Sequence, residues 1–450
     1  MGPYSFLGDM PDWPDTAYPQ GVTHSHGEAT FGGTSDMVSP YAVPFSSMSP
    51  ATPPPSGGEL PGTHPGDDSG GQFEEHPLTG EWSASPATFL EVLAEAPPGA
   101  TIELGAGVYR IPATINFRRH VFLIGAGSTR TRLESTGPGP VLRLAESAAL
   151  ALRDLTIAVV NDAPGNVIEA TDGALIMERV RVTGARGRRN IPAPETPDDT
   201  SPEPGYGLVV GGAVWATITG CQFDGNEAGG ICVRDACAPT LVDIQTEGGT
   251  AGVVFCGQSA GALTRSRCIG AAIGILVLDR ARPVLDANIC RANTHTGIAY
   301  RLLATGLARA NDCSDNGSAG IWVGDAATPT LESNQCRGNR TAGIVFRRAS
   351  GGIAVGNSCT GGAIAGIWIG EGACPELESN RCEANGNGLS YTEFGAGSAR
   401  GNICAANSLF GISVAVLASP VLEANDLSGN VLGTIVDHRM PDSGALIVPN

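Results

Sequence analysis

The sequence of 450 residues has no lysine, few aromatic residues and no long apolar run. Aromatic side chains make up 5% of the chain while glycine accounts for 63 residues, so a globular core built on large aromatic side chains is not expected. No apolar stretch reaches the roughly 18 residues that a membrane-spanning helix needs. The N-terminus, Met1-Gly-Pro-Tyr-Ser-Phe, lacks a basic segment followed by an apolar one, and no secretory signal is expected.

The charge balance is strongly acidic. All 27 basic residues are arginine and they face 45 acidic residues, which gives a net charge of −18. Such a charge argues against binding to a nucleic acid backbone or to an anionic membrane. It is compatible with a protein, a peptide or a neutral glycan as the partner.

A fixed period runs through the second half of the sequence. Asparagines keep this period two residues before the cysteine positions, from Asn288 to Asn425, and a Gly-Ile pair or its equivalent recurs from Gly252 to Gly411. The period predicts one supersecondary unit stacked on copies of itself. The cysteines that define it are spaced about 23 residues apart. They are Cys268, Cys290, Cys313, Cys336, Cys359, Cys382 and Cys404.

Each repeat predicts one coil of a parallel β-helix. Residues 320–342 contain three short alternating stretches separated by Gly, Asn, Pro and Asp, each suited to a strand and too short for a helix. In the Gly-Ile-x-Val stretch, the side chains one and three residues after the glycine, such as Ile321 and Val323, are expected inside. A leucine row that includes Leu331 and the cysteine row serve the other two strands. The asparagines are expected at the bends, bonded to the backbone and to one another.

These columns resemble the right-handed parallel β-helix proteins of the pectin-lyase-like superfamily, in the subset with G-I-x-[VIL] and [PT]-x-L-E-x-N-x-C-x-x-N in each coil. The resemblance covers roughly residues 100 to 435 and implies an all-β, single-chain right-handed β-helix. Each coil is then expected to hold three short strands in about 23 residues. The superfamily includes polysaccharide lyases, hydrolases, epimerases, phage tailspikes and non-catalytic interaction modules. The resemblance therefore predicts the fold and leaves the function open.

Composition divides the chain into four parts. Residues 1–80, rich in Pro, Gly, Ser and Asp, are expected to form a disordered tail. Residues 81–100 are expected to form a capping helix with Ser85 as N-cap and Pro86 at its first position. The β-helix is expected over 101–435, with an insertion loop at 186–205, and a C-terminal cap over 436–450. An apolar cluster near the start of the tail reads either as a docking motif or as a feature without a specific role: Tyr4, Phe6, Leu7, Trp13 and Tyr18.

The cysteines and acidic residues do not indicate a metal site or a cofactor. The one-per-coil spacing predicts free, buried thiols in a reducing cytoplasm, which act as small hydrophobic side chains. Asp279 and Asp325 lie two coils apart, about 9.6 Å along the stack, too sparse for calcium. His295 is the histidine within the regular coils. A pair between His295 and Asp312 or Asp315 of the next coil stays open as an alternative.

An outward apolar stripe is the main candidate for a site. The residue two positions after the column glycine should face solvent, yet five successive coils over about 20 Å are apolar there. Such a stripe is typical of an interaction surface, with cover by the tail or by the 186–205 loop as the alternative. Two tryptophans beside arginines and carboxylates fit a protein interface or a sugar-stacking groove, while the charges alone also fit solvated turns. The candidate binding residues are Leu276, Trp322, Val345, Trp368, Arg301, Arg347, Asp279 and Asp325.

The main hypothesis from the sequence is a cytoplasmic, non-catalytic scaffold that binds a protein or peptide partner along this stripe. The alternative is a carbohydrate-active enzyme, a lyase or epimerase of acidic polysaccharide, that uses Arg301 or Arg347 with nearby carboxylates. A third possibility is a chain that modifies or shields a peptide, its own tail included. A homo-oligomer formed through the stripe would also account for outward tryptophans. The sequence does not identify catalytic residues.

Overall fold

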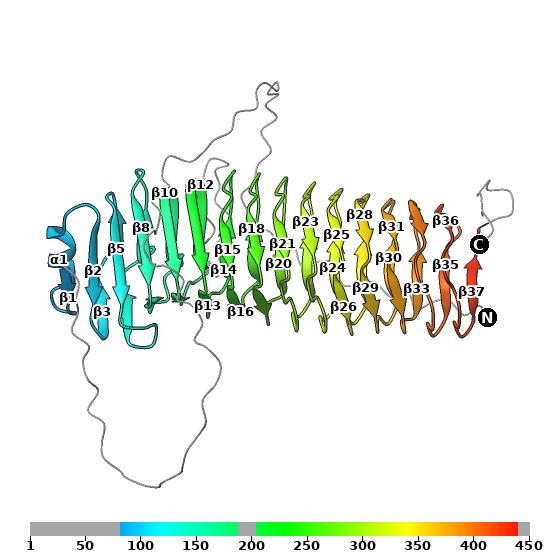
Figure 1. Cartoon of the computed structure of the whole chain (residues 1–450), viewed down its shortest axis with the longest axis horizontal. Coiled ribbons are helices and arrows are strands. Elements are labelled where there is room, and N and C mark those ends of the chain that lie inside the picture. Colours follow the sequence, from blue (N-terminus) through cyan, green and yellow to red (C-terminus); the bar gives the residue numbers. More distant parts are fainter. Residues whose placement is uncertain (1–81, 188–203, 440–450) are drawn as a thin grey trace, which may run out of the picture. The chain divides into compact units, whose positions relative to one another are not determined.

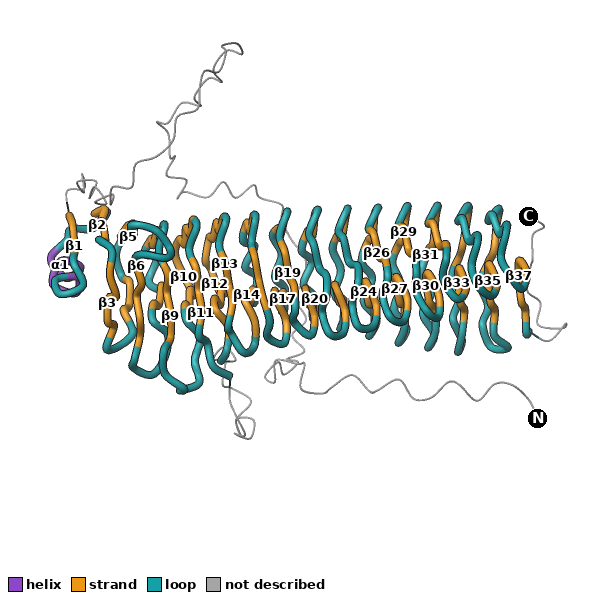
Figure 2. The backbone as a smooth tube through the Cα atoms, turned by 90° about the horizontal axis from the view of Figure 1, so that it is seen from below, coloured by secondary structure: helices purple, strands orange, loops and turns teal. Residues whose placement is uncertain are grey.

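The computed structural model describes residues 82–187 and 204–439. They form a short helix and a stack of about 15 coils of short parallel strands (Figure 1). The strands of successive coils stack into three columns that run along the stack (Figure 2). The predicted all-β parallel β-helix is therefore confirmed.

The Gly-Ile column contains the strands that carry the Gly-Ile repeats. Its strands pair in parallel, with Ile321 opposite Ile344 and Trp322 opposite Val345. The column consists of β4 (Ile115–Phe117), β7 (Leu142–Leu144), the first parts of β10 (Ile168–Glu178) and β12 (Tyr206–Thr219), β14 (Gly229–Val233), β17 (Ala251–Phe255), β20 (Ile273–Val277), β22 (Thr296–Tyr300), β24 (Ala319–Val323), β27 (Ala342–Phe346), β30 (Ala365–Ile369), β33 (Asn387–Tyr391), β35 (Phe410–Val414) and β37 (Gly433–Asp437).

The Leu column follows the Gly-Ile column in each coil. Both columns belong to one 27-stranded sheet, because β10 and β12 each run through the two columns. The Leu column consists of β1 (Trp82–Ala84), β2 (Ala100–Leu104), β5 (Val121–Gly125), β8 (Ala149–Arg153), the second parts of β10 and β12, β15 (Thr240–Val242), β18 (Ala262–Thr264), β21 (Val284–Asp286), β23 (Leu307–Arg309), β25 (Thr330–Glu332), β28 (Ile353–Val355), β31 (Glu376–Glu378), β34 (Ser398–Arg400) and β36 (Val421–Glu423).

The Cys column closes each coil. Its strands form sheets of seven and three strands, and single bridges at Ile289, Asp312, Ile403 and Asp426 continue the column where no strand is assigned. It consists of β3 (Gly107–Ile111), β6 (Thr131–Ser135), β9 (Thr156–Val159), β11 (Arg181–Thr183), β13 (Gln222–Asp224), β16 (Gln245–Glu247), β19 (Arg267–Ile269), β26 (Gln335–Arg337), β29 (Ser358–Thr360) and β32 (Arg381–Glu383).

The core fills the inside of the coils. In the coil that begins at β24, Ile321, Val323, Leu331 and Cys336 are fully buried, as the period-two pattern predicts. All twelve cysteines are free thiols; Cys374 is exposed and the others are buried. The prediction of stacked interior thiols is thus confirmed for the Cys column.

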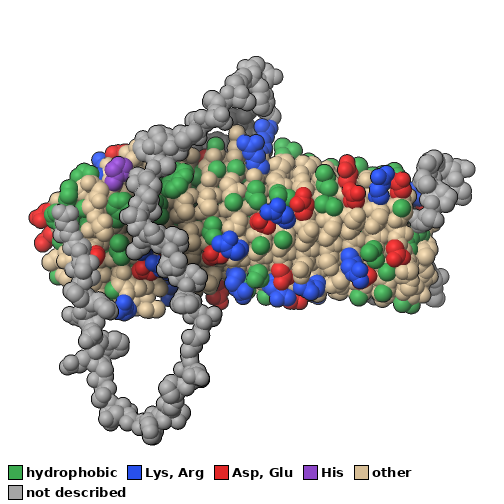
Figure 3. Space-filling view, in the orientation of Figure 1, with side chains coloured by type: hydrophobic (Ala, Val, Ile, Leu, Met, Phe, Trp, Pro, Cys, Tyr) green, Lys and Arg blue, Asp and Glu red, His purple; other side chains and the backbone are tan. Residues whose placement is uncertain are grey.

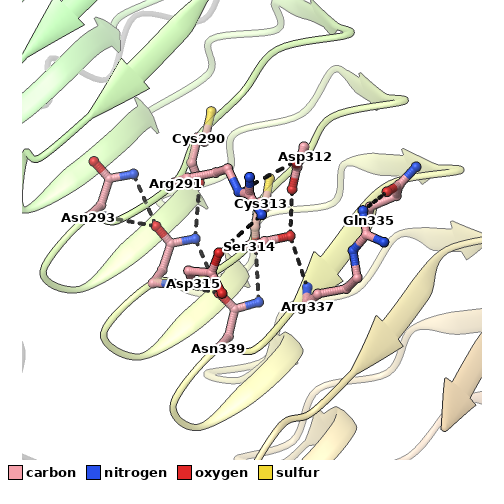
Figure 4. A network of polar contacts seen from close by, with 11 residues as sticks. Cys290, Arg291, Asn293, Asp312, Cys313, Ser314, Asp315, Gln335, Arg337 and Asn339 are labelled. Atoms are coloured by element: carbon pink, nitrogen blue, oxygen red, sulfur yellow. Dashed lines mark hydrogen bonds and ion pairs between the residues drawn. The ribbon is translucent and has the colours of Figure 1, made fainter.

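Two asparagine ladders join successive coils. In the first ladder, the amide Nδ2 of Asn311 donates to Oδ1 of Asn334 at 3.0 Å, and Asn334 donates to Asn357 at 2.9 Å. The second ladder lies on the other side of the Cys column; Figure 4 shows Asn293 and Asn339 of this ladder beside Cys290 and Cys313. These buried amides satisfy one another and the backbone of the bends, as predicted.

A glycine recurs in the Gly-Ile strands of the regular coils because two coils approach there too closely for a side chain. A Cβ atom on Gly320 would lie 2.7 Å from the carbonyl oxygens of both Cys313 and Gly343, and 2.8 Å from Nδ2 of Asn339. These distances are shorter than a carbon–oxygen contact allows, so the column selects glycine by space.

The helix α1 (Phe89–Glu95) lies at the N-terminal end of the stack (Figure 1). Its N-cap is Thr88, so the predicted start at Ser85 and Pro86 is wrong. The Ser85 carbonyl instead accepts a bond from the Thr88 amide at 3.1 Å, which closes a turn ahead of the helix. Phe89 is buried and packs edge-on against Tyr109, with ring centroids 5.5 Å apart, while Leu90 faces solvent.

Several expectations fall on residues outside the described ranges. These are the disordered tail at 1–80, most of the insertion at 186–205 and most of the cap at 436–450. Strand β37 runs to Asp437, two residues into the predicted cap.

Candidate functional site

The outward side of the Gly-Ile column carries a second apolar cluster, separate from the core inside the coils. We call it the apolar face. Its central row has one residue per coil, two positions after the column glycine, and the register places these residues directly above one another. The central row consists of Val209, Cys232, Val254, Leu276, Ala299, Trp322, Val345 and Trp368.

The apolar face is buried. Trp322 and Trp368 are 7% and 5% exposed, Leu276 is 2% exposed and Val345 is fully buried. The expectation of an exposed stripe at these residues is therefore wrong. Outward direction on a strand follows from the sequence period, but exposure also depends on what lies over the strand.

A row of charged side chains runs beside the C-terminal half of the apolar face. It arises because each coil leaves its Gly-Ile strand through a left-handed residue, with φ of 53° at Asp325, 54° at Arg348, 50° at Glu371 and 40° at Glu393. The repeated turn stacks these side chains at the coil spacing of about 4.8 Å. We call Arg301, Asp325, Arg347, Arg348, Glu371 and Glu393 the charged row.

Arginines and carboxylates alternate along the charged row. Asp325 accepts from Nε of Arg301 at 2.6 Å and lies 3.5 Å from Nη1 of Arg348. Arg348 in turn lies 3.7 Å from Glu371. Arg347 pairs with Glu371 and lies 3.5 Å from Glu393. Across one face of the stack, Figure 3 likewise shows acidic and basic side chains side by side.

The two tryptophans are held between the apolar face and the charged row. The guanidinium carbon of Arg347 lies 4.9 Å from the centre of the Trp368 ring, a cation–π contact. The Trp368 indole N–H donates to Oγ1 of Thr392 at 3.0 Å. The position four residues after the column glycine is Arg301, Gly324 and Arg347 in successive coils. Gly324 leaves room for the Trp322 ring, because a Cβ there would lie 2.8 Å from Nε1 of Trp322.

The structure brings most of the predicted site residues together. Arg301 joins Asp325, and Arg347 joins Trp368, while Leu276 and Val345 belong to the apolar face. Asp279 is separate, because its Oδ2 accepts from the backbone amide of Gly257 at 2.8 Å and so stabilises a turn.

The predicted site omitted four residues that the structure places in it. These are Arg348, Glu371, Glu393 and Thr392. The first three occupy the same turn position of the repeat as Asp325, so the repeat itself contained the signal. Nothing in the sequence singles out Thr392.

The two acidic residues considered as partners of His295 pair with Arg291 instead. Asp312 and Asp315 lie 3.5 Å and 3.1 Å from side-chain nitrogens of Arg291, as Figure 4 shows. His295 Nδ1 lies 3.2 Å from Oγ1 of Thr294. Within 82–187 and 204–439, no three His, Cys, Asp or Glu side chains gather as a metal site would require.

Among the described residues, none of the helices has the length and apolarity needed to cross a membrane.

Comparison with known proteins identifies the family. The profile of the family described as "Right handed beta helix region" matches residues 206–380 and 307–443. Together these matches span more than half of the chain, which therefore belongs to the right-handed β-helix family. No curated protein sequence matches it.

Solved structures share the fold at low sequence identity. The bacteriophage Phi29 gene product 12 N-terminal fragment has a TM-score of 0.53 at 10% identity, over 80% of this chain and 71% of that chain. The A-module of mannuronan C-5 epimerase AlgE4 from Azotobacter vinelandii has a TM-score of 0.45 at 14% identity, over 77% and 91%. The catalytic unit of a GH87 α-1,3-glucanase from Streptomyces thermodiastaticus has a TM-score of 0.43 at 14% identity, over 83% and 68%. At such identities the likeness shows the fold alone.

The main hypothesis from the sequence needs correction. A non-catalytic scaffold that binds its partner along an exposed apolar stripe requires a free stripe, and Trp322 and Trp368 are buried. The alternative, a carbohydrate-active enzyme, does not require a free stripe at these residues.

Proposed function

We propose that the chain is a carbohydrate-active enzyme whose substrate, an acidic polysaccharide, binds along the charged row. The observation that carries this proposal is the row of charged turns on successive coils, in which Arg347 pairs with Glu371 and lies 3.5 Å from Glu393. A polysaccharide is itself a linear repeat, so a row with one charged turn per coil offers successive sugar units equivalent contacts.

The arginines supply recognition of the acidic sugar. Guanidinium groups bind carboxylates through paired, charge-assisted hydrogen bonds. Arg348, with a side chain 42% exposed, is the arginine of the row most open to such a ligand. The net charge of −18 opposes non-specific attraction of a polyanion, so binding depends on these few arginines and weakens with salt.

The carboxylates supply the proton chemistry of a lyase or an epimerase. Both reactions begin with removal of the proton next to the uronate carboxylate, which becomes acidic when a cation neutralises that carboxylate. Glu393 is the more exposed carboxylate beside Arg347 and is our candidate base. In elimination the carbon–oxygen bond to the leaving sugar breaks, a double bond forms and the leaving oxygen takes up a proton. In epimerisation a proton donor other than the base delivers a proton to the opposite face of the same carbon.

Turnover of a panel of polyuronates tests the proposal. Ultraviolet absorbance detects the unsaturated product of a lyase, and proton NMR of the polymer detects an epimerised sugar. We expect R348A to weaken polymer binding and E393Q to abolish turnover while the fold, followed by circular dichroism, is unchanged.

The matched control is R309A. Arg309 forms an exposed pair with Asp286 at 2.8 Å on the Leu column, away from the charged row, and its loss should leave turnover intact. If no polyuronate is bound or converted, or if R309A and R348A lose binding equally, the proposal is wrong.

A further inference from the structure

The apolar face is buried more deeply than a strand surface in this stack can be by itself. Outward apolar residues on the Leu column provide the comparison, because Val284, Ile353 and Val421 are 38%, 42% and 52% exposed. Val284 and Ile353 are paired with a strand on both sides, as are Val254 and Val345, yet Val254 and Val345 are fully buried. A segment of polypeptide must therefore lie over the apolar face.

The described coils contain no segment that is free to leave the stack and lie over the apolar face. From 206 to 430 the chain advances one coil for about every 23 residues, and strands and tight turns use all of them. The cover in a single chain must then come from residues 1–81, 188–203 or 440–450.

Reach distinguishes these three segments. The apolar face spans seven coil steps from β12 to β30, or about 34 Å. Residues 188–203 are attached at both ends next to β12, so their number limits their reach to about 27 Å, less than the distance to Trp368. Residues 440–450 begin beyond β37, ten coils or about 48 Å from Tyr206, and reach at most about 37 Å.

The N-terminal segment has the required length. It joins the stack at β1, five coil steps or about 24 Å from β12. Residues 19–81 cover that distance several times over, and an extended segment of 18 residues spans about 60 Å. The segment can therefore lie along the whole apolar face.

The chemistry of the N-terminal segment also matches the face. Large apolar side chains are concentrated at its start, at Tyr4, Phe6, Leu7, Trp13 and Tyr18, whereas 188–203 has Ile191 alone. Positions 1–23 include Asp9, Asp12 and Asp15 and no basic side chain. The edge of the face carries arginines in the same position of three coils: Arg234, Arg301 and Arg347.

We propose that residues 4–18 bind along the apolar face of the same chain, with their aromatic side chains on its central row and their aspartates toward its arginines.

Two cysteines report on the cover without any assay of activity. Cys232 and Cys256 belong to the apolar face and are buried, while Cys374 is exposed elsewhere. A hydrogen bond to Cys232, together with burial, raises the pKa of Cys256, so this thiol is unreactive as long as the cover is in place.

Titration of the native full-length protein with an aromatic disulfide reagent tests the proposal. We expect one fast thiol, Cys374, in the wild type. We expect three in the full-length variant F6S/W13S and in a variant that lacks residues 1–23, and one again when C232S/C256S is added to either variant. The matched control F31S/Y41S, which removes two aromatic residues of the N-terminal segment outside 4–18, should keep one fast thiol.

Three results would overturn the proposal. These are three fast thiols in the wild type, one fast thiol in F6S/W13S and in the shortened variant, or thiols that become reactive on dilution of the wild type to a monomer. The last result would identify a second copy as the cover. Failure of the polyuronate assay leaves the thiol result unaffected, so the two proposals fail separately.

Discussion

Replacement of one asparagine in the middle of the first ladder should destabilise the whole stack. Asn334 is fully buried and donates from Nδ2 to the carbonyl of Ala308 and to Oδ1 of Asn357, both at 2.9 Å. Its own Oδ1 accepts from the backbone amide and from Nδ2 of Asn311, both at 3.0 Å. The variant N334A removes all four bonds at once.

The cost follows from the groups that are left without partners. The backbone amide of Asn311 loses its acceptor inside the protein, where an unsatisfied group costs about 1–3 kcal/mol. Nδ2 of Asn311 keeps its bond to the Leu285 carbonyl, and Oδ1 of Asn357 keeps its bond from the Asn334 backbone amide, so these two groups lose only part of their hydrogen bonding. We expect N334A to lower the free energy of unfolding by about 3–5 kcal/mol.

Urea unfolding followed by circular dichroism measures this effect. The matched control is N116A, because Asn116 is exposed and makes one long bond of 3.4 Å to Thr114; we expect a change below about 0.5 kcal/mol. N425A, at the end of the ladder, removes three bonds and should be intermediate. If N334A were no more costly than N116A, the ladder would not stabilise the fold and the reasoning would be refuted.

Three further predictions concern the core, the close contact between coils and the charged row. The Tyr109 hydroxyl donates to Ala84 and Gly105 at 2.8 and 3.0 Å, so Y109F should cost about 1–2 kcal/mol at neutral pH in urea unfolding. Burial raises the pKa of Tyr109 to about 12, so its neutral form stabilises the fold below pH 10, and the advantage of wild type over Y109F should shrink between pH 10 and about 12. G320A should destabilise by about 1–3 kcal/mol, whereas G105A, where the nearest atom would be 3.8 Å from Cβ, should not; equal effects would contradict the steric role of the column glycine. If a polyuronate binds, its affinity should fall as salt rises and R348A should flatten that dependence; a parallel salt slope in R348A would argue against a contact there.

The repeat made much of the fold predictable. Inward positions such as Ile321, Leu331 and Cys336 follow from local alternation, and the coil period shows which residues stack. The asparagine ladders are predictable for the same reason, because each amide meets its equivalent one coil away. The start of α1 was not predictable, since Ser85 and Thr88 form a competing turn whose strength depends on local geometry.

Part of the candidate site was also within reach of the sequence. Arg301 and Arg347 occupy the same position in the repeat and Asp325 occupies the next one, so the period places all three on one side of the stack. Their pairings were not predictable, because a long side chain can turn to a carboxylate in its own coil, the coil above or the coil below. The choice of Glu371 and Glu393 by Arg347 depends on side-chain directions that the stacked turns impose.

The sequence by itself determined the coil, its three columns, the residues that point inward and the residues that point outward. All of these follow from the alternation along each strand and from the coil period, which act between near neighbours along the chain or between equivalent positions of adjacent coils. Only the tertiary structure decided that the outward Trp322 and Trp368 are buried. Burial of an outward strand surface requires a segment that lies outside the repeat, and no local pattern specifies where such a segment binds.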